Sequence, residues 1–143
     1  MIEGEIAFVD TTRQLLDVME TFLKESVGQV IKTNKADFEL YAKISGSNNM
    51  KNVEKLLEND FQVLSYDEAM DVLKAAKPKA FKVPLPTMGG NLSSEHEMYL
   101  VEKHCKGVPV FIVDWHPEAK PFYARVDQSN NKIQASKKYP KKS

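Results

Sequence analysis

The sequence has little of several things that particular functions require. Its single cysteine, Cys105, excludes an internal disulfide framework and indicates a reducing compartment. Acidic and basic residues balance at 20 each, so the excess of positive charge typical of a nucleic-acid-binding surface is missing. No apolar run approaches the roughly 20 residues of a membrane-spanning helix. Because Met1 leads directly into an acidic segment, we expect neither a membrane location nor a cleavable targeting segment in this chain.

Side chains that bind nucleotide phosphates or metals are also scarce. Arg13 and Arg125 are the two arginines of the sequence, and Met88-Gly89-Gly90 is too short to be a glycine-rich phosphate-binding loop. The histidines and Cys105 match no standard zinc-ligand spacing, so no metal site is predicted. We therefore expect Cys105 to be a packing residue.

What the sequence does contain is a series of helix and strand patterns, and its length of 143 residues indicates one domain. Apolar periodicity and cap residues predict the α+β class, with antiparallel strands backed by helices. The long helix after the cap candidates 10–12 carries one apolar stripe, which we expect to pack on a sheet. The predicted elements are a strand at 2–9, this long helix, helices at 36–44 and 52–59, a strand at 61–64, a helix at 66–76 capped by Ser65, a helix from 93 or 94 to 104, and a strand at 109–113.

The segment after the last of these strands is the first candidate site. A second strand beginning at Phe122, just past a proline-bounded turn, is expected to lie antiparallel beside residues 109–113. Lys120 and Tyr123 would then lie at a strand edge, where a cation and an aromatic hydroxyl can bind a small polar ligand. A surface lysine and a core tyrosine are the alternatives.

Three acidic residues are weaker candidates. Glu97 could orient a substrate ammonium group, although acids in a first helical turn also complement the helix dipole. Glu3 and Glu5 alternate along the first predicted strand, so both carboxylates lie on one face and could bind a magnesium ion or an ammonium group.

Several short motifs resemble the asparaginyl-tRNA synthetases, which form a class II subclass together with the aspartyl and lysyl enzymes. Residues 1–8 resemble the strand that ends the second signature motif of the family, and Ser65–Ala69 resembles the family's SYTEA helix start. The remaining matches follow in the family's order: Glu95-His96-Glu97, Tyr99-Leu100, Pro109-Val110-Phe111 and Lys120-Pro121-Phe122-Tyr123. The resemblance covers residues 1–135.

This resemblance implies an asparagine–tRNA ligase that uses ATP and Mg²⁺ and acts as a homodimer on tRNA-Asn. Lys120 would hold the side-chain oxygen of asparagine and Tyr123 would form a wall of the pocket. Glu3 and Glu5 would lie on a strand that lines the active-site sheet. His104-Cys105 and the KPFY block resemble the mitochondrial or bacterial-like branch, which favours the mitochondrial matrix over the cytoplasm.

The departures from the family define a further set of expectations. Residues 1–135 resemble a partial catalytic domain without signature motifs 1 and 3, and 136–143 form a divergent, lysine-rich tail that we expect to be solvated and disordered. Neither arginine matches an ATP-binding position, so we expect no aminoacylation by this chain alone. The alternatives are a non-catalytic synthetase-like interaction module and an unstable partial product. The choice between asparagine and aspartate stays open.

Overall fold

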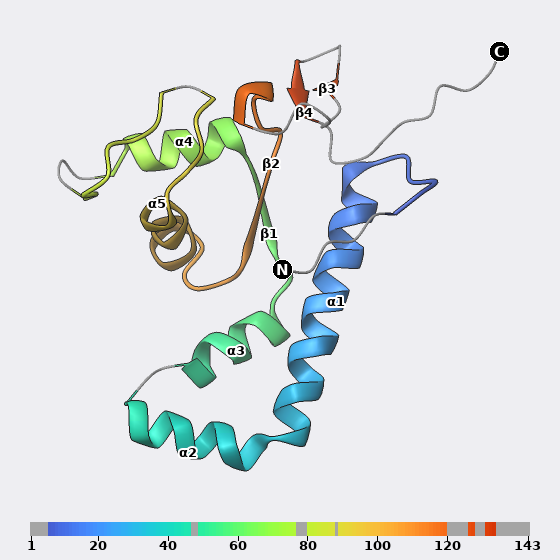
Figure 1. The fold of residues 1–143 in the computed structure, drawn as a ribbon, viewed down its shortest axis with the longest axis vertical. Coiled ribbons are helices and arrows are strands. Elements are labelled where there is room, and N and C mark those ends of the chain that lie inside the picture. Colours follow the sequence, from blue (N-terminus) through green and yellow to red (C-terminus); the bar gives the residue numbers. More distant parts are fainter. Residues whose placement is uncertain are drawn as a thin grey trace.

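The computed structural model describes residues 6–46, 49–76, 80–87, 89–119, 126–127 and 131–133. Within these ranges the chain forms a helical arm and an α/β unit beside it (Figure 1). The helical arm consists of α1 (Thr12–Thr33), α2 (Lys35–Ser45) and α3 (Asn49–Glu58). The α/β unit consists of β1 (Gln62–Ser65), α4 (Tyr66–Lys74), α5 (Ser94–Tyr99), a π-helical turn (Leu100–His104) and β2 (Val110–Val113), followed by a 3-10 turn (Pro117–Ala119), β3 (Val126–Asp127) and β4 (Lys132–Ile133).

Local cap chemistry sets the ends of the arm helices. Thr11 is the N-cap of α1, and the side-chain oxygen of Gln14 accepts hydrogen bonds from the backbone N–H groups of Asp10 and Thr11. Gly46 ends α2 in the left-handed conformation, at φ 61°, where a glycine has no Cβ penalty. The predicted cap at 10–12 is thus confirmed.

Helix α1 does not bury its apolar stripe as the sequence predicts. It contacts α2 and α3, and Leu16 is its one buried residue. The large apolar residues of α1 that remain exposed are Val18, Met19, Phe22, Leu23 and Val30. The prediction that this apolar stripe is buried on a sheet is therefore wrong for the described residues, because most of the stripe stays exposed.

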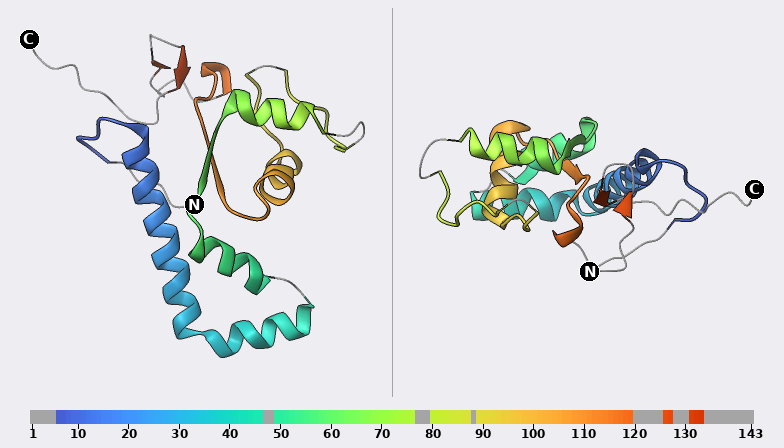
Figure 2. Two further views of the ribbon diagram at one scale, coloured as in Figure 1. Left: turned by 180° about the vertical axis from the view of Figure 1, so that it is seen from behind. Right: turned by 90° about the horizontal axis from the view of Figure 1, so that it is seen from above.

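The two longer strands run in parallel, whereas the sequence predicts a sheet of antiparallel strands. The antiparallel strand predicted to begin at Phe122, beside residues 109–113, lies outside the described residues. Gln62 pairs with Val110 and Ser65 with Val113. A parallel pair needs a long crossover, and the segment from α4 to the π-helical turn provides it. Figure 2 shows α4 and α5 on one side of this pair and α1 on the other. Strands β3 and β4 are antiparallel, and the α+β class is confirmed.

The hydrophobic core lies between α4, α5 and β2. Tyr66 and Leu100 are fully buried at its centre. The other buried members of this cluster are Ala69, Met70, Leu73 and Leu92. Phe61, the residue before β1, contacts Phe111 of β2, with ring centroids 5.4 Å apart. The core therefore fixes the N-terminal end of α4 against the chain that follows β2.

The predicted strand at 2–9 is described only from residue 6. Residues 6–9 form no strand, and Phe8 has φ 60° with 94% of its surface exposed.

Among the described helices, none is long and apolar enough to cross a membrane.

Candidate functional site

The candidate residues from the sequence fall mostly outside the described residues. Lys120, Tyr123, Glu3 and Glu5 all lie in ranges that the structure does not describe. Their proposed roles therefore stay predictions. The described residues form a polar cluster around the first turn of α4. This cluster includes His116, which lies four positions before Lys120 in the sequence.

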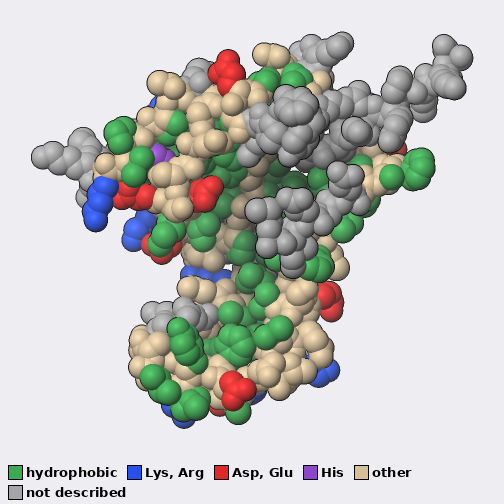
Figure 3. All heavy atoms as spheres, in the orientation of Figure 1, with side chains coloured by type: hydrophobic (Ala, Val, Ile, Leu, Met, Phe, Trp, Pro, Cys, Tyr) green, Lys and Arg blue, Asp and Glu red, His purple; other side chains and the backbone are tan. Residues whose placement is uncertain are grey.

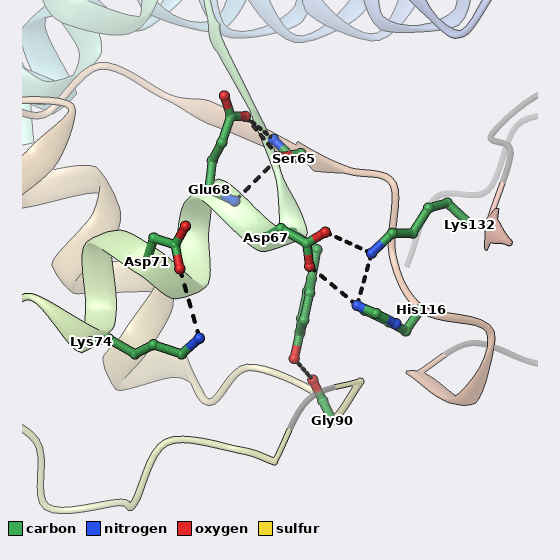
Figure 4. Close-up of polar contacts among 9 residues, drawn as sticks. Ser65, Asp67, Glu68, Asp71, Lys74, Gly90, His116 and Lys132 are labelled. Atoms are coloured by element: carbon green, nitrogen blue, oxygen red, sulfur yellow. Dashed lines mark hydrogen bonds and ion pairs between the residues drawn. The ribbon is translucent and has the colours of Figure 1, made fainter. Parts of the chain in front are cut away.

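A capping box fixes the start of α4. The backbone N–H of Glu68 donates to Ser65 Oγ at 3.2 Å, and the N–H of Ser65 donates back to Glu68 Oε2 at 2.8 Å. The Ser65 N–H is the largest cause that lowers the pKa of the Glu68 carboxyl, and the Ser65 hydroxyl, which donates to Glu68 Oε2 at 2.8 Å, adds to it. Figure 4 shows this box beside the acidic first turn. The predicted Ser65 cap is confirmed, and it sets the direction in which Asp67 points.

Asp67 reaches two residues that are far away in the sequence. Its Oδ1 lies 3.2 Å from Nε2 of His116, and its Oδ2 accepts from Nζ of Lys132 at 2.8 Å. The Lys132 Nζ also lies 2.8 Å from His116 Nε2 (Figure 4). Nε2 of His116 can accept from Lys132 or donate to Asp67 but cannot do both, so the tautomer of the imidazole decides which of these two contacts is a hydrogen bond. We call Asp67, His116 and Lys132 the Asp67 cluster.

The electrostatics of this cluster favour the ionised form of the Asp67 carboxyl. The ammonium of Lys132 is the largest cause that lowers the pKa of the Asp67 carboxyl, and His116 adds to it, against a smaller opposing effect of burial. The Lys132 side chain is only 17% exposed, whereas that of Asp67 is 50% exposed. Within this ion pair, the Lys132 side chain is therefore largely buried, whereas the Asp67 side chain is half exposed to solvent.

Tyr66 and two glycines support the cluster from beneath. The Tyr66 ring packs edge-on against the His116 ring, with centroids 5.3 Å apart, and its hydroxyl donates to the carbonyl of Gly90 at 2.7 Å. Burial raises the pKa of the Tyr66 hydroxyl. Gly89 has φ 92°, and a Cβ there would lie 2.8 Å from Glu118 Oε2. Gly89 therefore allows this loop to approach the chain around His116.

His96 has a structural role in the first turn of α5. Its ring is 1% exposed; Nδ1 accepts from the Ser93 N–H at 3.2 Å, and Nε2 lies 3.1 Å from the carbonyl of Val83. This pattern assigns a neutral imidazole that donates through Nε2. Glu95 accepts from the backbone N–H groups of Val83 and Lys82, and these bonds lower the pKa of its carboxyl.

Glu97 lies next to these residues but faces elsewhere. It is exposed and lines a cavity of about 650 Å³ between α3 and α5, together with Lys55 and Asn52. Lys55 spans this region by donating to the carbonyl of Lys106. Both interpretations of Glu97, the substrate ammonium and the helix dipole, stay predictions.

Cys105 is buried at the end of the π-helical turn, as expected for a packing residue, and burial raises the pKa of its thiol. In the described part of the chain, no group of three or more histidine, cysteine or acidic side chains could hold a metal ion.

Sequence reasoning missed the Asp67 cluster. Residues Ser65–Ala69 predict only a capped helix start, and His116 is one of the histidines whose spacing matches no zinc site. Asp67 and His116 are 49 positions apart, so a local pattern carries no signal of their contact. The sequence does carry part of the signal. Asp67 follows one predicted strand and His116 follows another, and strands of one sheet are expected to pack on the same core.

Comparisons with known proteins give a consistent result. Residues 1–142 match the family model described as tRNA synthetases class II (D, K and N). The chain is 37% identical over 129 residues to an asparaginyl-tRNA synthetase of Mus musculus, and 38% identical over 125 residues to one of Homo sapiens. These matches cover 90% and 87% of this chain but 26% of each relative, so the chain spans about a quarter of their length.

Solved structures are similar in fold. The asparaginyl-tRNA synthetase from Pyrococcus horikoshii matches with a TM-score of 0.67 at 21% identity, covering 87% of this chain and 27% of that one. The same enzyme complexed with asparaginyl-adenylate matches with a TM-score of 0.68 at 22% identity, covering 87% of this chain and 26% of that one.

Proposed function

The chain belongs to the class II tRNA synthetase family (D, K and N), and from this premise we propose that it supplies the asparagine-binding part of an asparagine–tRNA ligase. The observation that carries the proposal is the match to asparaginyl enzymes of mouse and human at 37% and 38% identity over most of the chain. Asparagine is favoured over aspartate for this reason, since the family itself includes both.

The proposed reaction has two steps. A carboxylate oxygen of asparagine attacks the α-phosphorus of ATP, the bond to the β-phosphate bridging oxygen breaks, and pyrophosphate leaves with asparaginyl-adenylate as the product. A terminal ribose hydroxyl of tRNA-Asn then attacks the asparaginyl carbonyl carbon, loses its proton and displaces AMP. The first step needs positive charge around the phosphates.

The described residues do not fit ATP with Mg²⁺. Arg13, the arginine among them, pairs with Asp17 on an exposed face of α1 at 2.7 Å. Among the described residues, no group of three or more histidine, cysteine or acidic side chains could hold a metal ion. We therefore assign no step of adenylate formation to these residues and propose that this chain alone binds asparagine without activating it.

Lys120 and Tyr123 are the proposed contacts of asparagine. The Lys120 ammonium would donate to the side-chain oxygen of asparagine as a compact charge with three donors. The Tyr123 ring would form a wall of the pocket. Ala119, the last residue of the 3-10 turn, is buried and directly precedes Lys120 in the sequence.

Calorimetric titration of the purified chain with asparagine tests this proposal. The expected result is saturable binding of asparagine that is at least about tenfold tighter than that of aspartate. Lys120→Met should weaken asparagine binding, whereas Lys51→Met, which changes an exposed lysine of α3, should not. Equal binding of asparagine by both variants would exclude Lys120 as the contact.

We further propose that the whole protein is a homodimer that acts in the mitochondrial matrix on tRNA-Asn. The His104-Cys105 pair and the KPFY block support this location over the cytoplasm. Subcellular fractionation tests the location and sedimentation of the purified protein tests the dimer. A protein confined to the cytosolic fraction would contradict the first, and a monomeric one the second.

A second candidate function is a non-catalytic interaction module. The exposed apolar side chains of α1, among them Phe22 and Val30, favour it, because such a face is usually covered by another surface. Figure 3 shows hydrophobic side chains exposed over the helical arm. A chain that ignores asparagine but binds another protein through this face, and loses that binding in Phe22→Ser, would support the module instead.

A further inference from the structure

A groove lies between the helical arm and the α/β unit. The cavity of about 650 Å³ between α3 and α5 is lined on the arm side by Asn52, Lys55 and Leu56, whose spacing of three and four positions puts them on one face of α3. Its opposite wall includes the exposed residues Glu97 and Met98 of α5. Figure 3 shows the molecule narrowing between the arm and the α/β unit. Because the two walls belong to different parts of the fold, the position of the arm sets the width of this groove.

The chain passes from the arm to the α/β unit through one short link, residues 59–61 between α3 and β1. Helix α1 holds this link by two contacts: Glu20 accepts from the N–H of Phe61 at 3.2 Å, and Lys24 pairs with Asp60 at 3.7 Å. Both contacts lie at the link itself. They therefore hold a pivot in place without fixing α3 against α5.

Lys55 joins the arm to the α/β unit away from this link. Its ammonium donates to the carbonyl oxygen of Lys106, which lies just after the π-helical turn. Of the hydrogen bonds and ion pairs between described residues, this is the one that connects α1, α2 or α3 with the chain beyond residue 61. The distance between α3 and α5 thus depends on a single charged donor.

The turn at Lys106 accommodates this ammonium. Lys106 and Gly107 both have positive φ, at 54° and 87°, and the N–H of Gly107 donates to the carbonyl of Val101 at 2.7 Å, which holds the turn on the π-helical residues. A Cβ at Gly107 would lie 2.7 Å from Lys55 Nζ and 3.1 Å from its Cδ. Glycine at this position therefore leaves the space in which the Lys55 side chain reaches its acceptor.

The two parts keep their internal contacts when this hydrogen bond is broken. The buried members of the core cluster around Tyr66 and Leu100 all lie after residue 61, and α1, α2 and α3 contact one another. Local openings of this kind need much less free energy than global unfolding. The hydrogen bond of Lys55 can therefore open and re-form while both parts stay folded.

We propose that the helical arm is a lid over the groove between α3 and α5, which turns about residues 59–61 and is held in the observed closed position by the hydrogen bond from Lys55 to Lys106. When Lys55 releases the carbonyl, α3 moves away from α5, and the wall that carries Met98 becomes accessible. Neither Lys55 nor Lys106 is a proposed contact of asparagine, so the test of the lid does not depend on asparagine binding.

Pulsed electron paramagnetic resonance on the full chain measures the position of the arm. Spin labels attach to Lys43→Cys on α2 and Lys74→Cys on α4, which are exposed positions, while the buried Cys105 stays unlabelled. Lys55→Met removes the donor but keeps a long side chain, and Lys51→Met, an exposed position on the same helix, is the matched control. We expect one short distance in the native chain and in Lys51→Met. Lys55→Met should add a longer distance, with the ratio of closed to open chains lowered about tenfold or more.

Gly107→Ala tests the same hydrogen bond from the side of the acceptor. The added Cβ displaces the ammonium while Lys55 itself is unchanged, so the longer distance should appear here too. Gly46→Ala is the control, because Gly46 also has a positive φ, at 61°, and its added Cβ meets nothing within 4 Å. Amide hydrogen exchange of α4 in Lys55→Met should match that of the native chain, since the lid opens without unfolding the core.

A longer distance in Lys55→Met and Gly107→Ala that is absent from both controls supports the lid. An unchanged distance in either Lys55→Met or Gly107→Ala would overturn it, because the hydrogen bond to Lys106 would then not hold the arm. The same longer distance in Lys51→Met would overturn it as well. So would faster exchange throughout α4 in Lys55→Met, since the arm would then separate by unfolding.

Discussion

The carboxylate of Glu20 on α1 accepts a hydrogen bond from the backbone N–H of Phe61, the residue before β1, at 3.2 Å. The same carboxylate pairs with Lys24 at 2.6 Å, and the Lys24 ammonium lies 5.6 Å from the centroid of the Phe61 ring. The Glu20 side chain is only 12% exposed. This contact joins the helical arm to the α/β unit.

Replacing Glu20 by alanine should therefore destabilise the chain. The substitution leaves the N–H of Phe61 without its acceptor, and hydrogen bonds to charged groups contribute about 1.5–3 kcal/mol. Urea unfolding should show a loss in this range. Glu25→Ala is the control, since Glu25 is exposed on the same helix and should change stability by less than about 0.5 kcal/mol. Equal losses in both variants would exclude the Phe61 contact as the cause.

His96→Leu should be more harmful than the same change at His104. The buried His96 ring satisfies both the N–H of Ser93 and the carbonyl of Val83, and leucine can bond to neither. Each buried polar group left without a partner costs about 1–3 kcal/mol. His104 is exposed, so His104→Leu should leave the melting temperature nearly unchanged. Similar melting temperatures for the two variants would contradict a structural role of His96.

Two glycines with positive φ allow a matched test of close approach. Gly46 has φ 61°, and a Cβ added there would meet nothing within 4 Å, whereas a Cβ at Gly89 would lie 2.8 Å from Glu118 and 3.3 Å from His116. Gly46→Ala should cost about 1 kcal/mol for the left-handed backbone alone. Gly89→Ala should cost more, as measured by urea unfolding, because the added Cβ would also crowd the Cβ of His116 even after the flexible Glu118 carboxylate moves aside. The reverse order would contradict the packing of this loop against residues 116–118.

The carboxyl groups around α4 and α5 give stability a defined pH dependence. Hydrogen bonds and charges lower the pKa values of Asp67, Glu68 and Glu95 in the folded chain. A lowered pKa contributes stability that is present above the unfolded value, near 4, and is lost as the pH falls through the folded value. Urea unfolding between pH 7 and pH 3 should therefore show falling stability below about pH 4.5. Asp67→Asn should flatten this fall, and an unchanged slope would contradict the role of Asp67 in it.

Much of the local structure follows from the sequence. The helix predicted at 36–44 is α2 at Lys35–Ser45, and the Ser65 cap with Glu68 starts α4 as predicted. These elements are set by caps, loop residues and apolar periodicity within a few residues. The predicted helix to 104 also exists, although its last turn is π-helical.

The larger arrangement could not be predicted in the same way. The parallel direction of β1 and β2 depends on how a crossover of more than 40 residues packs, which no strand pattern specifies. The exposure of Phe22 depends on which surfaces reach α1. The contact of Asp67 with His116 exists only once α4 and the end of β2 share the core around Tyr66.

The most direct test of asparagine binding is a thermal melt of the purified chain with and without millimolar asparagine, repeated with its sulfamoyl-adenylate analogue. A ligand that binds only the folded chain stabilises it by about 2.7 kcal/mol at a concentration a hundred times its dissociation constant. We expect a cooperative transition that asparagine shifts upward and that aspartate shifts less. A transition that neither asparagine nor the analogue shifts would contradict an asparagine site in this chain.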